Sequence, residues 1–279
     1  MIRIVTDTAS DITRSQAERM GIDLVEIPIT FEDGPCAQAE EKDFETFYER
    51  LKTCAHLPVT SRPTPDAYRK IYEQARRDGD DVVVLTLSSG LSGTYDSALM
   101  AQKMAGYDRV HVVDTHQAIL AQRMLVECAV DLRSEGYSAA DIARLITQRR
   151  DQVMVCGLVG SLKYLHMGGR IPASLALAGK MLHIKPVIVL KDKILQSAGK
   201  VRGAKAGTAA LHKLMEEAGV NKAYPLYFGY TSDRELGDAF MQATREKYPS
   251  CKATMHPIGG IIGTHCGMDC MAVAFMKLK

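Results

Sequence analysis

Short apolar runs alternate with amphipathic stretches along this chain. Runs rich in Val, Ile and Leu, such as residues 81–87, are typical of buried strands. In residues 43–52, Phe44, Phe47, Tyr48 and Leu51 recur at helical spacing, which predicts an amphipathic helix. We expect strands at 2–5, 24–29, 81–87, 109–114 and 153–158, and helices at 15–20, 43–52, 68–77, 96–104, 118–134 and 138–150. This alternation favours right-handed βαβ units and a parallel sheet.

The pattern changes after residue 158. Two apolar runs, 184–190 and 194–196, flank a polar turn and predict an antiparallel hairpin. Further on we expect helices at 208–218 and 234–247, strands at 226–230, 253–257 and 271–276, and a glycine-rich turn at 259–267. The sequence thus predicts an α/β protein of two domains: an N-terminal domain, 1–158, with a mostly parallel sheet flanked by helices, and a C-terminal α+β domain, 159–279.

Composition narrows the functional classes. The net charge of the 279 residues is +2, so no overall charge attracts the chain to nucleic acid. The seven cysteines are scattered without a C-x-x-C pair, which is typical of a reducing compartment. The first residues lack a signal-peptide stretch, and no apolar segment approaches the ~20 residues that span a bilayer. We therefore expect a soluble, cytoplasmic protein.

Four predicted loops carry groups suited to an oxyanion. Residues 88–94 lie between a strand and a helix, a geometry that directs free backbone N–H groups at an anion. The other three loops contain Thr60 and Ser61, Gly168 to Arg170, and Gly263 to His265. Each loop alone is weak evidence, and residues 88–94 are also explained as a strand-to-helix turn with hydroxyl caps. Taken together, the four loops suit a carboxylate or a phosphate.

Other chemistries have weaker support. A serine esterase or thioesterase would use Ser92 with His265 and an orienting Asp7 or Asp114, but Gly90 stands one place too early for a G-x-S-x-G elbow. The spacing of His265, Cys266 and Cys270 fits no closed zinc pattern, and no Walker-type loop is present. We expect no metal and no cofactor.

Several motifs in one order resemble those of the DegV family. They are residues 5–11 (VTDTASD), 60–65 (TSRPTP), 88–95 (SSGLSGTY), 164–171 with its GGRI end, 185–187 (KPV) and 262–267 (IGTHCG). The resemblance spans nearly the whole chain. It implies two α/β domains with one long-chain fatty acid held in the cleft between them. Some members of that family present the fatty-acid carboxylate to a separate kinase subunit, which makes acyl phosphate for phospholipid synthesis.

The resemblance also implies site residues. Position by position, it places carboxylate ligands at Thr60, Ser92 and His265, with the neighbouring Ser61, Gly93 and Thr94 shaping the same pocket. Arg170 is expected near the domain junction, either at the head group or holding the domains together. Arg202 lies in a stretch similar to the kinase-docking surface of kinase-linked members, although that stretch is less basic here.

Two departures from the family pattern stand out. Arg62 stands where a glutamine is common. Residues 268–270 replace the usual Pro-Gly-small turn, so Asp269 brings a negative charge close to the expected anion site. That charge would tune His265 or indicate a different ligand.

We therefore expect a non-catalytic fatty-acid carrier. Burying roughly fifteen methylenes would contribute on the order of 12 kcal/mol, so the tail would dominate affinity and the polar loops would set orientation. The expected partners are a long-chain fatty acid, a fatty acid kinase subunit and, transiently, the membrane surface, with no nucleic acid. The alternatives are the Ser92 hydrolase and a binding protein for another small anion, such as a phosphorylated metabolite.

Overall fold

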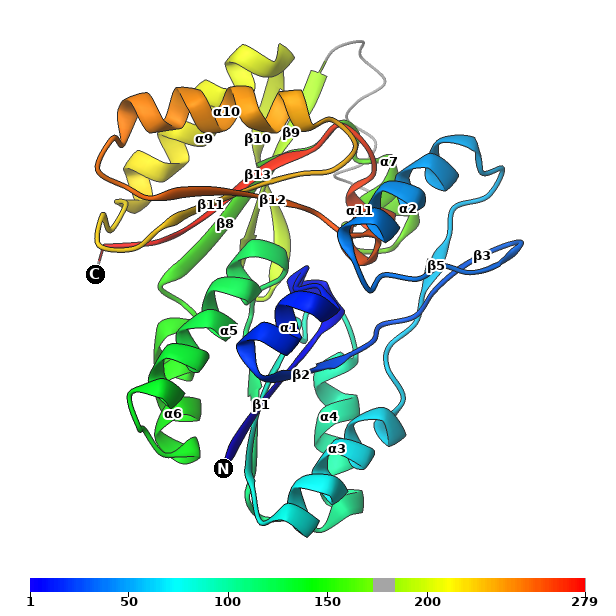
Figure 1. The fold of residues 1–279 in the computed structure, drawn as a ribbon. Helices are drawn as coiled ribbons and strands as arrows, with labels where there is room; N and C mark the ends of the chain where they lie inside the picture. The colour runs from blue at the N-terminus through cyan, green and yellow to red at the C-terminus, as the bar shows by residue number, and fades with distance from the viewer. Residues whose placement is uncertain (173–183, 279) are drawn as a thin grey trace.

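The computed structural model describes residues 1–172 and 184–278, and its first sheet is parallel throughout (Figure 1). This sheet has the strand order β2-β1-β6-β7, formed by β1 (Ile2–Asp7), β2 (Ile22–Val25), β6 (Asp81–Thr86) and β7 (Val110–Asp114). The parallel N-terminal sheet of the sequence prediction is therefore confirmed.

Helices cover both faces of this sheet because residues along β6 are buried alternately on each side. Val82 and Val84 pack with α3 (Pro65–Asp78) and α4 (Thr94–Ala105), whereas Val83 and Leu85 belong to the core on the opposite face. On that second face lie α5 (Ile119–Ser134) and α6 (Ala139–Arg149), with the short η1 (Thr8–Ser10) and α1 (Arg14–Met20) nearby.

A six-stranded sheet forms the second half of the molecule. Its order is β10-β9-β8-β13-β11-β12, and only the β11–β12 pair is parallel. The strands are β8 (Val153–Leu158), β9 (Ile184–Lys191), β10 (Ile194–Arg202), β11 (Leu226–Tyr230), β12 (Ala253–Pro257) and β13 (Met271–Met276). The predicted hairpin is the β9–β10 pair. Helices α9 (Gly203–Ala218) and α10 (Arg234–Lys247) cover one face, and α5 contacts β8, β11 and β13 on the other.

The sheet membership of β8 differs from the expectation. The predicted N-terminal domain, 1–158, included this strand, but β8 lies between β9 and β13 in the six-stranded sheet. A buried apolar run identifies a strand without identifying its neighbours, so the sequence pattern could not assign it to a sheet. Judged by sheet membership, the chain passes from the four-stranded sheet to the six-stranded sheet before Val153. The division into two domains itself stays a prediction.

A small arm connects the two halves. It consists of β3 (Ile29–Phe31), β4 (Gly34–Pro35), β5 (Val59–Thr60) and α2 (Glu41–Thr53), and α2 contacts α11 (Gly260–Cys266) of the second half. The predicted strand at 24–29 is thus split between β2 and β3, with Pro28 in the gap between them. Next to α11 lies the short α7 (Lys163–Met167).

The predicted glycine-rich turn at 259–267 was wrong, because most of it is helix α11. Glycine has a poor intrinsic helix propensity, but close packing overrides it here. A Cβ on Gly260 would come within 2.6 Å of Phe47, and one on Gly263 within 2.5 Å of the Tyr48 hydroxyl. The glycines let α11 lie directly against α2. Among the described residues, no helix is both long and apolar enough to cross a bilayer.

Candidate ligand-binding site

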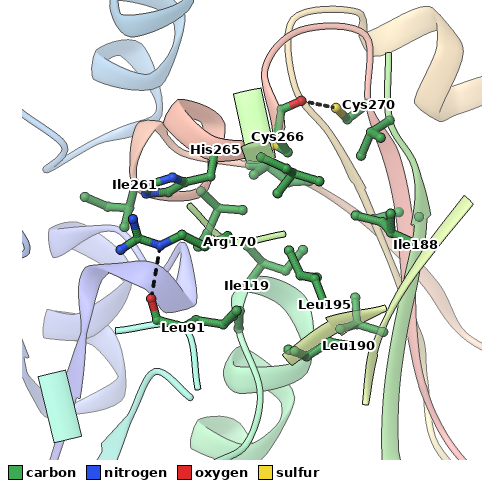
Figure 2. Close-up of a pocket in the computed structure, with 18 of the residues that line it drawn as sticks. Leu91, Ile119, Arg170, Ile188, Leu190, Leu195, Ile261, His265, Cys266 and Cys270 are labelled. Carbon is green, nitrogen blue, oxygen red and sulfur yellow. Dashed lines mark hydrogen bonds between the residues drawn. The ribbon is translucent and has the colours of Figure 1, made fainter. Parts of the chain in front are cut away.

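A largely apolar cavity lies between the six-stranded sheet and the N-terminal half of the chain (Figure 2). Its volume is about 950 Å³, counting the space open to solvent at its mouth. The wall comes from the loop after β6, the start of α5, strands β8 to β10, and α11. Its side chains include Leu91, Ile119, Ile188, Leu190, Leu195 and Ile261. A cavity with this lining suits an extended apolar ligand.

The polar side chains of the cavity carry positive charge or no charge. Among the described lining residues they are Thr60, Ser61, Arg62, Ser92, Arg170 and His265, and no Asp or Glu lines the cavity. Figure 2 shows Arg170 and His265 at one end, while Ile188 and Leu190 lie at the other. This distribution suits an amphiphile whose anionic head lies at the arginine end.

Thr60 and His265 meet although 205 residues separate them along the chain. Thr60 Oγ1 lies 3.0 Å from His265 Nε2, because β5 places the threonine beside α11. The other ring nitrogen, Nδ1, is buried without a hydrogen-bond partner. It faces Gly168, where a Cβ would come within 2.3 Å of it. Gly168 therefore makes room for the imidazole.

His265 is neutral at neutral pH. Burial, followed by the charge of Arg170, lowers the pKa of His265 to about 4. With its proton on Nε2, the ring donates to Thr60 Oγ1, and the threonine O–H can then donate to a bound anion. The pair can thus act as a short donor relay aimed at a carboxylate.

Ser92 sits in the turn that leads into α4. The N–H groups of Leu91 and Ser92 donate to the main-chain oxygen of Ser88, which closes the turn. The Ser92 hydroxyl lies 2.8 Å from that of Thr94, the first residue of α4. The N-cap residue, Gly93, has no side chain to cap this helix. The N–H groups of its first turn, which follow Ser92 in the chain, are therefore not occupied by a side-chain cap.

The structure separates the expected pocket residues into two sets. Thr60, Ser61, Ser92 and His265 line the cavity, whereas Gly93 and Thr94 are not part of its lining. Thr94 holds the Ser92 hydroxyl, and Gly93 packs against Arg62, whose Cδ would lie 3.0 Å from a Cβ there.

Arg170 connects the two halves of the molecule at the cavity. Its Nε donates to the main-chain oxygen of Leu91 at 3.2 Å, and its guanidinium also bonds the Gly168 oxygen. Burial lowers the pKa of this arginine. Both roles expected of it, at the head group and at the junction, are therefore compatible with one position.

Sequence reasoning missed Arg62 as a site residue. It lines the cavity, is exposed, and makes no hydrogen bond or ion pair with any described residue. The signal was a cation in a loop stiffened by Pro63 and Pro65, which was noted only as a departure from the family pattern.

The structure does not form the Ser92–His265 pair that the alternative hydrolase interpretation requires. Ser92 bonds Thr94 and His265 bonds Thr60, so the serine and the imidazole do not pair. Neither proposed orienting carboxylate contacts His265. Asp7 accepts from the Leu87 N–H at 2.7 Å, and Asp114 pairs with Lys193 at 3.1 Å.

The expected influence of Asp269 on His265 was also wrong. Asp269 bonds Ser232 and lies outside the cavity, and the pKa of His265 responds to burial and Arg170.

Arg202 is exposed at the end of β10, paired in the sheet with Ile184 and away from the cavity lining. Its expected docking role stays a prediction.

Within the described part of the chain, no three His, Cys, Asp or Glu side chains are placed to hold a metal ion.

Comparisons with known proteins agree with this architecture. The family model described as "Uncharacterised protein, DegV family" matches residues 1–278. A DegV domain-containing protein of Deinococcus radiodurans is 30% identical over 289 residues, which cover 100% of this chain and 99% of that protein. A solved structure on fatty acid binding of a DegV family protein from Thermus thermophilus is 28% identical, with a TM-score of 0.88 and 99% of each chain covered. The linoleic-acid-loaded fatty acid kinase B3 protein of Streptococcus pneumoniae has a TM-score of 0.86 over 100% of both chains; at 19% identity, this likeness shows the fold alone.

Proposed function

Because this chain belongs to the DegV family, we propose that it binds one long-chain fatty acid and presents the carboxylate to a separate kinase subunit. The acyl tail would occupy the apolar cavity between the two sheets. The carboxylate would lie at the end that contains Thr60, Ser92, His265 and the two arginines. The protein would shield the tail and leave the phosphorylation step to the kinase subunit.

The proposal is carried by the lining of the cavity. Most of its wall is apolar, and the polar side chains at one end carry hydroxyl groups or positive charge. None of the described lining residues has a carboxylate side chain. Burying a long tail contributes about 0.8 kcal/mol per methylene, which favours a fatty acid over a small polar anion. The Thermus thermophilus structure supports the same ligand class, because fatty acid binding is reported for that similar protein.

The kinase role rests on access to the carboxylate. Ser61 and Arg62 line the cavity and are exposed, so the head-group end opens toward solvent. A kinase active site could therefore reach a carboxylate held there while the tail stays covered. Arg202 is our proposed contact for that subunit.

Mass spectrometry of organic extracts from the purified protein tests the binding proposal. We expect a long-chain fatty acid at about one per chain, which matches one cavity per chain. Extracts without fatty acid, from protein that after delipidation also fails to bind oleate and palmitate, would overturn the proposal. A bound phosphorylated metabolite in the same extracts would favour the small-anion alternative.

A reconstitution assay with ATP and the kinase subunit of the same organism tests presentation. We expect acyl phosphate formation to need both proteins and to decrease with Arg202→Ala, while oleate binding stays unchanged. Lys205→Ala, in the same exposed stretch, serves as the comparison variant. Full activity without this protein would contradict the carrier role.

A further inference from the structure

Residues 5–11 carry two buried aspartates that the proposed function leaves without a role. Asp7 is the last residue of β1, and Asp11 follows η1 directly. Asp7 is completely buried, and 2% of Asp11 is exposed. Neither residue lines the cavity, so neither is placed to touch a ligand there. Both nevertheless hydrogen-bond main-chain groups of elements that do line it.

Asp7 holds the start of the turn that carries Ser92. Its Oδ2 accepts from the Leu87 N–H at 2.7 Å, and Leu87 lines the cavity directly after β6. Its Oδ1 accepts from the Ala9 N–H and from the Gln122 side-chain amide, each at 3.1 Å. Both carboxylate oxygens of Asp7 are therefore used as acceptors.

Asp11 holds the start of α11, the helix that carries His265. Its Oδ1 accepts from the Gly259 N–H at 2.9 Å, although 248 residues separate the two along the chain. Gly259 is the N-cap residue and has no side chain to satisfy the free N–H groups of the helix. A Cβ there would lie 2.9 Å from Asp11 Oδ1, so a local capping side chain has no room. The next N–H, of Gly260, donates to Gln38 Oε1. The cap of α11 thus comes from the N-terminal half of the chain.

The loop that carries both aspartates is itself held in place. The Asp11 N–H donates to the Thr8 main-chain oxygen at 3.3 Å, which closes the turn after η1. Arg123 of α5 donates from Nη1 to the Asp11 main-chain oxygen at 3.2 Å. Asp7 and Asp11 therefore fix the Ser92 turn and α11 to one common support.

Packing alone does not account for two carboxyl groups in this position. Burial raises the pKa of Asp7 to about 6 and that of Asp11 to about 8, which shows that the charged forms are disfavoured there. An apolar side chain of similar size would fill the same space without this cost. A carboxyl group adds a directed hydrogen bond to a main-chain N–H, and each bond lies at the start of an element that carries a head-group residue.

We propose that Asp7 and Asp11 are positioning residues for the fatty-acid carboxylate. Asp7 fixes the turn with Ser92, and Asp11 fixes α11 with His265, so that both side chains reach the same head group. This inference rests on the proposed function, because it needs a carboxylate at that end of the cavity. Since neither aspartate lines the wall along the tail, their loss should weaken recognition of the carboxylate and spare that of the alkyl chain.

Equilibrium binding of oleate and oleyl alcohol to delipidated full-length protein tests the proposal. The two ligands share one tail, and only oleate has the carboxylate. Asp7→Ala and Asp11→Ala should each weaken oleate binding at least about fivefold and oleyl alcohol binding less than about twofold, because a hydrogen bond to a charged group is the stronger one. Asp233→Ala is the matched control: it removes the helix cap that Asp233 gives to Leu236 of α10, away from the cavity lining, and should change neither affinity.

Asparagine distinguishes the two aspartates. Asp11 Oδ2 is buried without a hydrogen-bond partner, so Asp11→Asn keeps the one acceptor in use and should restore oleate binding to the parent value. Asp7→Asn must turn its NH₂ toward an N–H donor, because both oxygens of Asp7 are acceptors, and should bind oleate as weakly as Asp7→Ala. Both asparagine variants keep the size of the side chain, so this comparison decides the matter if an alanine variant does not fold.

Equal losses for oleate and oleyl alcohol in the alanine variants would overturn the inference, since they would indicate a role in stability alone. Oleate binding that Asp11→Asn fails to restore, or that Asp7→Asn leaves at the parent value, would also overturn it. The parent protein separates the two proposals. If it binds oleate and the variants bind like it, only the positioning role fails; if it binds neither ligand, the proposed function itself fails.

Discussion

His265 has two ring nitrogens in different surroundings. Nε2 lies 3.0 Å from the Thr60 hydroxyl, while Nδ1 is buried against Gly168 without a partner. Because burial and Arg170 keep the ring neutral, its proposed contribution to anion binding is a hydrogen bond passed through Thr60. The positive charge at the site comes from Arg62 and Arg170 instead.

Replacing Thr60 by valine should weaken oleate binding about 10-fold or more. Valine keeps the shape but removes a hydroxyl donor, and a hydrogen bond to a charged group contributes about 1.5–3 kcal/mol. Titration calorimetry on delipidated protein measures this change. Thr30→Val, at an exposed position of the same small sheet, is the matched control and should bind like the parent protein. Equal affinities for the two variants would remove Thr60 from the site.

The buried histidine also makes stability depend on pH. The pKa of His265 is lowered to about 4 in the folded protein, so between pH ~6.5 and ~4 the unfolded chain binds a proton there that the folded chain does not. The contribution of His265 to the free energy of unfolding should therefore fall as the pH falls through this range, whereas buried Asp7 and Asp11, whose pKa values burial raises to about 6 and about 8, contribute in the opposite direction. His256, whose pKa burial lowers to about 3, adds a loss in the same direction as His265.

Denaturant unfolding at several pH values can isolate this contribution. His265→Gln should flatten the decline between pH ~6.5 and ~4 and leave the part due to His256. His166→Gln, at an exposed position, should leave the profile unchanged. A His265→Gln profile as steep as that of the parent protein would show that the imidazole is not held neutral.

At the residue scale, the proposed polar ligands were predicted mainly from the family resemblance. Thr60, Ser61, Ser92 and His265 all line the cavity, although no spacing rule connects residues so far apart. The pairing of His265 with Thr60 instead of Ser92 could not be predicted, because it depends on how β5 approaches α11.

Helix α11 is the element whose packing fixes the site. It carries His265 and Cys266, and its glycines allow it to lie against Phe47 and Tyr48 of α2. Its sequence reads as a turn because glycine disfavours helices in isolation. The contact with α2 that reverses this preference is tertiary, so local sequence reasoning could not include it.

Gly263→Ala should destabilise the protein by about 1–3 kcal/mol, although alanine is the better helix former. The added methyl would lie 2.5 Å from the Tyr48 hydroxyl and 2.8 Å from Phe47. Tyr48→Phe removes the hydroxyl, so the double variant should lose less stability than the sum of the single variants. Strict additivity in denaturant unfolding would contradict this packing.

The tip of the β9–β10 hairpin closes one side of the cavity. The Ser88 hydroxyl donates to the Lys193 main-chain oxygen at 2.8 Å, and the Lys193 ammonium pairs with Asp114 at 3.1 Å. The same hairpin supplies Ile188, Leu190 and Leu195 to the wall. The hairpin itself was predicted from two apolar runs, but its docking on the 88–90 turn was not.

Lys193→Ala should therefore accelerate the release of bound fatty acid severalfold, because the tip loses its ion pair while the wall residues remain. Stopped-flow displacement of a fluorescent fatty acid measures the rate. Lys191→Ala, exposed on the same hairpin, should release at the parent rate. If both variants release alike, the Lys193–Asp114 pair has no part in closure.

At the scale of the whole molecule, one core extends across both sheets. Ile4 and Val83 of the parallel sheet belong to the same apolar cluster as Val155 and Ala272 of the six-stranded sheet, with α5 between them. The cavity is the part of this region that side chains leave unfilled. Every apolar residue in its wall looks like ordinary core in the sequence, so the cavity could not be traced before the fold was known.

A crystal structure of the protein with bound palmitate tests the central claim most directly. We predict a carboxylate within hydrogen-bond distance of Thr60 Oγ1 and Ser92 Oγ, with the alkyl chain extending past Ile119 toward Ile188 and Leu190. Palmitate with its carboxylate at the Ile188 end, or bound outside the space between the two sheets, would contradict the account.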